Sequence, residues 1–479
     1  MRIGSNAAWL IGCRISANLL NLVLFVAISR YFGPAGIGSY SYGFAIAGFV
    51  YVFGSLGIDE YGIREYTRSS IAQRPVLLGR LLGTQFLMLA LTTAGLAVYL
   101  LLTHASAATI GIVTALGVYQ LGYAIARTLF IPALADQAMM GPALIELICR
   151  GGAFVVAAAM LVLAGWPLVA AISLFAAFGV LMAVLALNLA RRHCRHVRVS
   201  ISRSGLGSTV RILWSFAAAE VMGQVYGRIG LIVLTLQVST QAAGLYATGG
   251  KFIETACMPF SYLGIAAYPR LSHLSISDND GFVRLARNLW HVWIVLGGLA
   301  LWGLFFVVPP LLVPLLGADF AAVGAVIELM MVLALMQVLE VILSRIMLAT
   351  DLQVARVRII TGAALLSLLL NFVLVSDLKL PGAILATTLT MTVMNLFYAV
   401  AIHRRVAGLH LGSEFALLLT ILLPGALIAW AVMALLHQPR HVAAIVSLLT
   451  LAIASLPLAL RYWRRDPRLM PTAASQRGD

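Results

Sequence analysis

Long apolar stretches with few charged residues recur along the whole chain. Each has about the 20 residues that a helix needs to cross a bilayer. Because β-barrel strands alternate over short segments, runs of this length predict helices and not strands. The pattern therefore predicts an all-α polytopic membrane protein with about 14 transmembrane helices. The expected spans are 7–30, 38–57, 76–102, 107–131, 141–164, 167–190, the more polar 209–238 and 241–269, 284–316, 322–348, 356–376, 380–402, 415–436 and 441–461.

Composition supports this interpretation and excludes a soluble protein. Of the 479 residues, 62% are apolar and only 10% are charged, whereas soluble domains carry roughly 25% charged residues. The net charge is +15, which in a soluble protein would suggest a nucleic-acid partner. Here the positive-inside rule accounts for most of it, because the Lys and Arg residues gather in alternate loops. We therefore expect no nucleic-acid partner, and a multi-pass protein of the bacterial inner membrane with both termini in the cytoplasm.

A weak internal repeat relates two parts of the chain at an offset of about 206 residues. Residues 38–43 and 244–249 both read G-x-Y-x-x-G, and residues 56–61 and 263–268 both read L-G-I-x-x-Y. Both matches fall at equivalent places in the second and eighth spans. Duplication of a six-helix unit predicts two parallel bundles related by pseudo-two-fold symmetry. The expected parts are an N-terminal bundle (1–190), a basic cytoplasmic linker (191–208), a C-terminal bundle (209–403) and two additional helices with a cytoplasmic tail (404–479).

Nine ionisable residues fall well inside the expected spans. A charge at the bilayer centre costs roughly 2.5–3.5 kcal/mol even on lenient scales. Nine such charges facing lipid would outweigh the stability of most proteins, so they must face one another or a wet cavity. They are Arg14, Arg150, Arg228, Lys251, Glu146, Glu220, Glu254, Glu328 and Glu340.

The spacing of these residues indicates shared helix faces. Residues 14, 18 and 21 follow i, i+4, i+7, and residues 220, 224 and 228 follow i, i+4, i+8. Glu146 and Arg150 stand at i, i+4, so they either form an intrahelical pair or belong to a site. Guanidinium groups bind phosphate through a fork of donors, and amides suit sugar hydroxyls. The candidate substrate-binding residues are Arg14, Asn18, Asn21, Arg150, Gln224, Arg228 and Lys251, and the candidates for proton or ion coupling are Glu146, Glu220 and Glu254.

Residues 30–40 read RYFGPAGIGSY. This segment resembles the R-x-L-G-P-x-x-Y-G-x-Y signature of polysaccharide-biosynthesis flippases, with Phe32 and Ile37 as departures. Their superfamily also holds multidrug antiporters and the lipid II flippase. The resemblance implies export of undecaprenyl-pyrophosphate-linked oligosaccharide units for O-antigen, capsule or exopolysaccharide assembly, by alternating access through a cationic cavity. It adds Arg30 to the candidate binding residues, and it implies membrane lipid, a polysaccharide polymerase and export machinery as partners.

Other function classes remain as alternatives. One is a cation-coupled multidrug antiporter or a lipid II-type flippase of the same superfamily, although the first span offers Arg14 and no carboxylate for a cationic drug. A membrane polysaccharide polymerase or ligase ranks behind these, because the loops expected outside are short. The sequence contains no nucleotide-binding, nucleophile or metal-spaced motif. We therefore expect a protein that is not an enzyme, with no catalytic residues, no metal and no cofactor.

Overall fold

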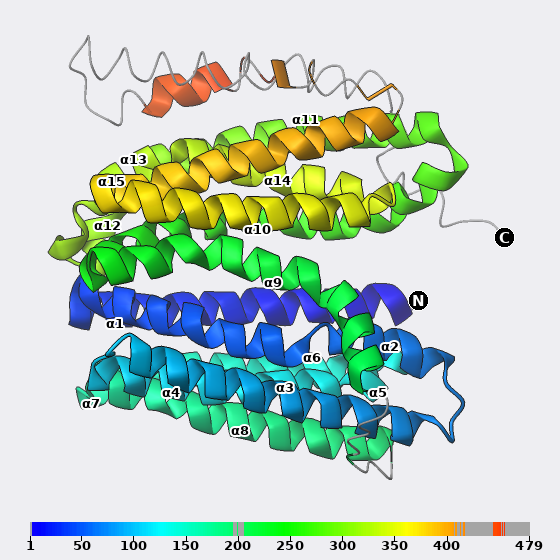
Figure 1. The fold of residues 1–479 in the computed structure, drawn as a ribbon. Coiled ribbons are helices and arrows are strands. Elements are labelled where there is room, and N and C mark those ends of the chain that lie inside the picture. Colours follow the sequence, from blue (N-terminus) through cyan, green and yellow to red (C-terminus); the bar gives the residue numbers. More distant parts are fainter. Residues whose placement is uncertain are drawn as a thin grey trace, which may run out of the picture. The chain divides into compact units, whose positions relative to one another are not determined.

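The computed structural model describes residues 2–194, 199, 206–406 and short pieces between 408 and 455. Every regular element within these residues is a helix, which confirms the all-α prediction (Figure 1). Short π-helical turns cover Leu147–Gly151 and Gly303–Val307, and a 3₁₀ turn covers Ala318–Phe320. The α-helices are α1 (Arg2–Ser55), α2 (Ile58–Arg68), α3 (Arg74–Leu102), α4 (Ala107–Leu129), α5 (Ile131–Ala135), α6 (Met140–Glu146), α7 (Gly152–Ala164), α8 (Leu168–His193), α9 (Leu206–Gln237), α10 (Thr240–Ser277), α11 (Asn279–Trp302), α12 (Val308–Leu316), α13 (Val323–Leu329), α14 (Met331–Ala349) and α15 (Gln353–Arg405).

The helices match the expected spans once two kinks are taken into account. Helix α1 bends at Gly33, and α15 bends at Lys379, so each contains two expected spans. Among the described residues, eight helical stretches are long and apolar enough to cross a membrane, including both bent ones. The more polar α9 and α10 occupy the places expected for the seventh and eighth spans. The span expected at 415–436 lies outside the described helices, as does most of 441–461.

The chain divides into two compact units, and the boundaries between them fall inside α10, α12, α13 and α15. Unit 1 comprises residues 1–248, 312–323 and 360–390, and unit 2 comprises the remainder. Unit 1 therefore contains α1 to α9 together with short segments from the second half of the sequence. The division into bundles at 1–190 and 209–403 stays a prediction.

In unit 1, α4 and α8 run side by side (Figure 1). Their backbones approach closely at Gly122 and Gly179, where the Cβ of any other residue at position 122 would lie 2.8 Å from the Cα of Gly179. Because membrane helices lack a hydrophobic driving force between them, such small residues favour association by allowing close packing. The aromatic residues Tyr119, Phe154 and Phe175 pack edge to face beside this crossing.

Replacing Gly122 with Ala is expected to destabilise unit 1. The added methyl group meets the backbone of α8, and overpacking of this kind costs about 1–3 kcal/mol. Thermal unfolding of the detergent-solubilised protein measures the effect. Gly95→Ala in α3 is the matched control, because no atom lies within 4 Å of the added Cβ. Equal melting temperatures for the two variants would contradict the close approach of α4 and α8.

Unit 2 is held by polar contacts as well as by apolar packing. The amide of Asn395 donates to the carbonyl oxygen of Met336 at 2.8 Å, and Arg356 donates to Ser344 Oγ at 3.1 Å. Glu340, which stands inside an expected span, lies among Arg345, Arg356 and Ser344. These contacts explain how a membrane helix accommodates this carboxylate, because a buried charge requires partners.

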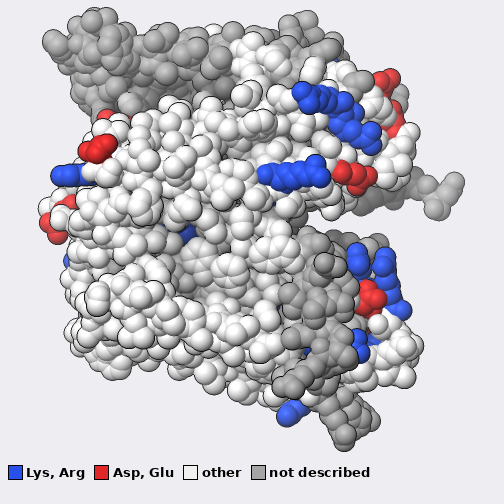
Figure 2. Space-filling model, viewed as in Figure 1, with Lys and Arg blue, Asp and Glu red and all other residues white. Residues whose placement is uncertain are grey.

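Charged side chains lie mainly toward the ends of the helices. On the face shown in Figure 2, most of the blue and red side chains stand at the two sides of the view, and the belt between them is largely white. Many large apolar side chains are exposed, among them Leu365, Leu369 and Phe372 on α15. Exposed apolar surface between charged ends is expected for a protein that faces lipid. The chain is therefore a multi-pass membrane protein.

Contacts of corresponding residues support the internal repeat. Gly43 packs against Ile112 in the fourth expected span, and Gly249 packs against Met330 in the tenth. Tyr40 contacts Phe175 in the sixth span, and the hydroxyl of Tyr246 lies 3.1 Å from that of Thr387 in the twelfth. In each case the partner spans are six apart, as duplication of a six-helix unit requires.

Candidate functional site

The helix of the second expected span ends at Ser55, close to the predicted end at residue 57. Leu56 and Gly57 adopt left-handed backbone conformations, with φ of 44° and 69°. A left-handed non-glycine residue is strained and persists only where its surroundings enforce it. The chain restarts there as α2, whose buried face includes Ile58, Asp59 and Tyr66. The break therefore places a carboxylate in the first turn of a new helix, where negative charge is favoured.

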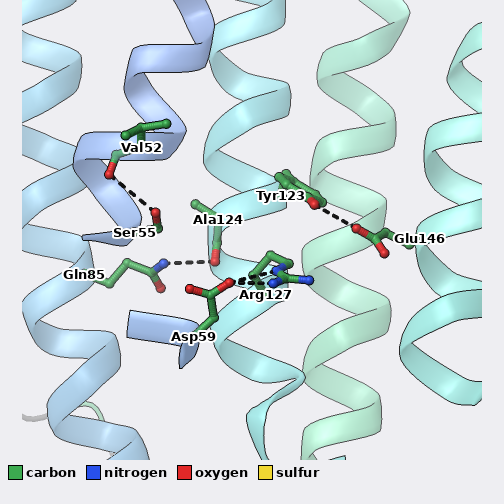
Figure 3. Close-up of polar contacts among 8 residues, drawn as sticks. All are labelled: Val52, Ser55, Asp59, Gln85, Tyr123, Ala124, Arg127 and Glu146. Carbon is green, nitrogen blue, oxygen red and sulfur yellow. Dashed lines mark hydrogen bonds and ion pairs between the residues drawn. The ribbon is translucent and has the colours of Figure 1, made fainter. Parts of the chain in front are cut away.

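Asp59 forms an ion pair with Arg127 of α4 (Figure 3). The Nη2 and Nε atoms of Arg127 donate to the same carboxylate oxygen at 2.6 and 3.1 Å. The side chains are only 9% and 21% exposed, respectively. One turn away on α4, the carbonyl oxygen of Ala124 accepts a bond from buried Gln85 at 2.9 Å. These contacts fix α2, α3 and α4 to one another.

Glu146 of α6 accepts a hydrogen bond from the hydroxyl of Tyr123 at 2.7 Å (Figure 3). Of the two interpretations of Glu146 and Arg150, the intrahelical pair is not observed, since no ion pair joins these two described side chains. The π-helical turn Leu147–Gly151 lies between them and widens the helix at that point. Glu146 therefore faces α4, and Arg150 is available for other contacts.

Arg150 and Arg228 lie within electrostatic reach of the same buried hydroxyl, that of Tyr40. Asn21 is within hydrogen-bonding reach of this hydroxyl. Three sequence-predicted binding residues thus converge, from the first, fifth and seventh expected spans. We call Asn21, Tyr40, Arg150 and Arg228 the cationic cluster.

A second group of polar residues carries mostly negative charge. The ring of Tyr51 packs against that of Tyr123 at a centroid distance of 5.0 Å. Asp59, Arg127, Glu146 and Glu220 all act electrostatically on the hydroxyl of Tyr51. We call these four charged residues the acidic cluster, because it contains three carboxylates and one guanidinium. The two clusters adjoin each other, because Glu146 also acts electrostatically on Arg150.

The remaining candidates have different surroundings. The Gln224 amide packs against Gly48, and Asn18 is half-buried. The side chain of Arg14 lies outside the described residues. In unit 2, Lys251 and Glu254 form an ion pair of 3.4 Å, in which the Glu254 side chain is 55% exposed.

Arg30 binds backbone, although the resemblance suggested a binding role. Its Nε donates to the carbonyl oxygen of Leu315 at 2.9 Å, and its Nη2 bonds the carbonyl oxygen of Pro314. Both acceptors lie in the last turn of α12, where carbonyl groups have no partner within the helix. A positive charge is also favourable at this end of a helix. Arg30 therefore caps α12.

Asp59, Tyr123 and Arg127 were not among the residues predicted from the sequence. A signal existed for two of them, because Tyr119, Tyr123 and Arg127 follow i, i+4, i+8 inside the expected span 107–131. That spacing puts one arginine and two tyrosines on a single helix face. Asp59 gave no such signal, since it lies just beyond the expected end of its span.

The chain matches a known family over more than half its length. The family model described as "Polysaccharide biosynthesis protein" covers residues 3–275. The chain belongs to this family. The matched region contains both clusters and the first part of the second repeat. No curated protein matches the chain in sequence.

Solved structures show which fold this family member has. The lipid II flippase MurJ in an inward closed conformation superposes with a TM-score of 0.76 at 13% identity, over 95% of this chain and 98% of that one. An inward-facing multidrug resistance MATE family transporter of the MOP superfamily gives 0.64 at 11% identity, over 85% and 99%. A MOP superfamily transporter from Pyrococcus furiosus gives 0.54 at 12% identity, over 85% and 95%. The fold is therefore that of MurJ and the MATE transporters.

Proposed function

We propose that this protein is a flippase for oligosaccharide repeat units linked to polyprenyl pyrophosphate. The observation that carries the proposal is the cationic cluster, where Arg150 and Arg228 both lie within electrostatic reach of one buried hydroxyl inside the membrane-spanning part of unit 1. Two guanidinium groups suit a pyrophosphate, because each presents a fork of donors to its oxygens. Asn21 and Tyr40 add groups that suit sugar hydroxyls. Membership of the polysaccharide biosynthesis family supports the glycan.

The proposed direction is from the inner to the outer leaflet of the bacterial inner membrane. The repeat supports alternating access, since transporters with parallel repeats bind substrate between the two halves and rock one against the other. Both termini lie in the cytoplasm in this proposal, as the distribution of arginines indicates. The delivered unit then enters O-antigen, capsule or exopolysaccharide assembly, where a polymerase and export machinery act on it.

The acidic cluster is our candidate for energy coupling. Glu146 and Glu220 are carboxylates inside the spans, and both act on Tyr51. Carboxylates within membrane helices are common in proton relays. Glu254 has a different setting, because it pairs with Lys251 on an exposed helix face. We therefore place coupling at Glu146 and Glu220 before Glu254.

Native mass spectrometry of the protein extracted from its own membrane tests the proposed substrate. The expected result is a co-purifying polyprenyl-pyrophosphate glycan at about one molecule per protein. In proteoliposomes, the same glycolipid should become accessible to an added glycosidase only when the protein is present. Export of cationic drugs without any bound glycolipid would favour the multidrug antiporter instead. Binding of lipid II alone would favour the lipid II-type flippase.

A further inference from the structure

Two glycines from the two repeats contact each other directly. Gly38 and Gly244 are the first residues of the two G-x-Y-x-x-G matches, and both belong to unit 1. A Cβ built on Gly38 would lie 3.0 Å from the backbone nitrogen of Gly244, and one built on Gly244 would lie 3.0 Å from that of Gly38. The carbonyl oxygens of Thr240 and Pro34 lie closer still. The contact is symmetric, because Pro34 and Thr240 each stand four residues before the glycine.

The contact leaves no room for a side chain of any size. The atoms that a Cβ would meet are backbone atoms of the opposing helix, which cannot move aside as a flexible side chain can. Close backbone approach of this kind is stabilised by Cα–H···O=C contacts and dispersion, which membrane helices use in place of the hydrophobic effect. Glycine at both positions is therefore a condition for the two helices to meet.

Further contacts surround the kink of α1 at Gly33. Arg30 caps α12, as described above, and Asp319 lies 3.3 Å from where a Cβ of Gly33 would stand. These contacts join residues of the first half of the sequence to the segment 312–323 of the second half, within one compact unit. By the predicted topology, the kink of α1 lies at the end of the helices that faces the outside of the membrane.

We propose that the Gly38–Gly244 contact closes this end of the translocation path, so that residue size at these two positions sets how often the end opens. The role of this closure in transport rests on the proposed flippase function. The closure itself can be tested without any substrate. Any residue larger than glycine clashes only when the helices meet, so it disfavours the closed arrangement and leaves the open one unaffected. Arg30 contributes to the same closure through its hydrogen bonds to α12, not through the size of its side chain.

Labelling of a single cysteine tests the closure. Cys13, Cys149, Cys194 and Cys257 are replaced with Ser, and Asn21→Cys serves as the reporter. Asn21 lies 12 residues before the Gly33 kink, and Gly38 lies five residues after it, so the reporter is about 10 Å deeper along the helix axis. A membrane-impermeant maleimide is then added from the outer side. We expect Gly38→Ala and Gly244→Ala to raise the labelling rate about tenfold each.

Two comparisons make the test decisive. Gly95→Ala is the matched control and should leave the labelling rate unchanged, since nothing lies within 4 Å of its Cβ. Arg30→Gln adds no bulk, so it should fold where a glycine variant fails, and it should raise labelling by a smaller factor. Unchanged labelling in Arg30→Gln and in every folded glycine variant would overturn the closure. Faster labelling in the glycine variants, together with no glycolipid bound to the wild-type protein, would keep the closure and refute only the proposed substrate.

Discussion

Replacing Arg150 and Arg228 together with Gln is expected to lower the rate of glycolipid transport more than about hundredfold. Each guanidinium would contribute charge-assisted hydrogen bonds to the pyrophosphate, worth about 1.5–3 kcal/mol each. Two such losses together lower the rate by more than about hundredfold even at the lower figure. Both residues are changed because both lie within electrostatic reach of the buried hydroxyl of Tyr40. Glutamine preserves much of the side-chain length and can still donate one hydrogen bond, so the loss reports charge. Transport is measured in proteoliposomes, and bound glycolipid is measured by native mass spectrometry.

Two further variants show whether the loss of transport comes from the lost charge, from the lost donor geometry or from removing any arginine. Lysine at both positions keeps the charge but lacks the planar fork of donors, so it should retain part of the activity. Arg284→Gln is the matched control, because this arginine is 71% exposed. Its ion pair with Asp278, at 3.8 Å, is also exposed and therefore weak. The Arg284→Gln protein should transport at the wild-type rate. Wild-type transport in the Arg150→Gln/Arg228→Gln protein would remove the cationic cluster from the proposed site.

Breaking the Asp59–Arg127 pair is expected to lower the free energy of unfolding by about 3–5 kcal/mol. In Asp59→Asn, Arg127 keeps its charge in a setting where it is 21% exposed and loses the carboxylate that accepts both of its bonds. Removing one partner of a buried pair is costly because the remaining charge stays desolvated. The same substitution also loosens α2, which is fixed to α4 by this pair. Thermal and chemical unfolding in detergent measure the effect.

A double substitution separates the loss of the pair from the loss of packing. Asp59→Leu with Arg127→Met removes both charges and fills a similar volume. It should recover most of the stability, because apolar replacements of buried ion pairs are often neutral or stabilising. If Asp59→Asn alone proves as stable as the wild type, the pair is not a structural element of unit 1. Transport by the double variant shows whether the flippase activity requires the charges of Asp59 and Arg127.

Much of the fold could be predicted from the sequence because a bilayer leaves few options. Apolar runs of about 20 residues must be helices, and the kinks of α1 and α15 fall where the expected spans join. The G-x-Y-x-x-G match was informative because both of its glycines serve as close contacts between helices. What apolar length cannot show is that the chain continues past the end of the second expected span as a new helix, α2, after the left-handed residues Leu56 and Gly57.

The candidate site was predictable only in part, for a physical reason. Spacing along a helix indicates which residues share a face, and α9 carries Gln224 and Arg228 four residues apart. It cannot show which face of another helix is opposite, so the Tyr123–Glu146 bond and the Asp59–Arg127 pair were missed. Spacing also left an intrahelical Glu146–Arg150 pair as one of two alternatives, and the pair is not observed, because a π-helical turn intervenes and Glu146 accepts a hydrogen bond from Tyr123. Arg30 was expected to bind substrate, and the structure shows it bound to the backbone of α12.

The symmetry of the Gly38–Gly244 contact has a consequence for the ancestry of the chain. Pro34 faces Gly244, and Gly38 faces Thr240, which occupies the position of Pro34 in the second copy. A residue i that meets residue j of the other copy, while j meets i, is the pattern of an isologous homodimer. If the chain arose by the predicted duplication, the six-helix ancestor placed this glycine on a two-fold axis, against itself. In such a homodimer, one mutation changes the residue on both sides of the interface. In the fused chain, Gly38 and Gly244 are separate positions and can change independently.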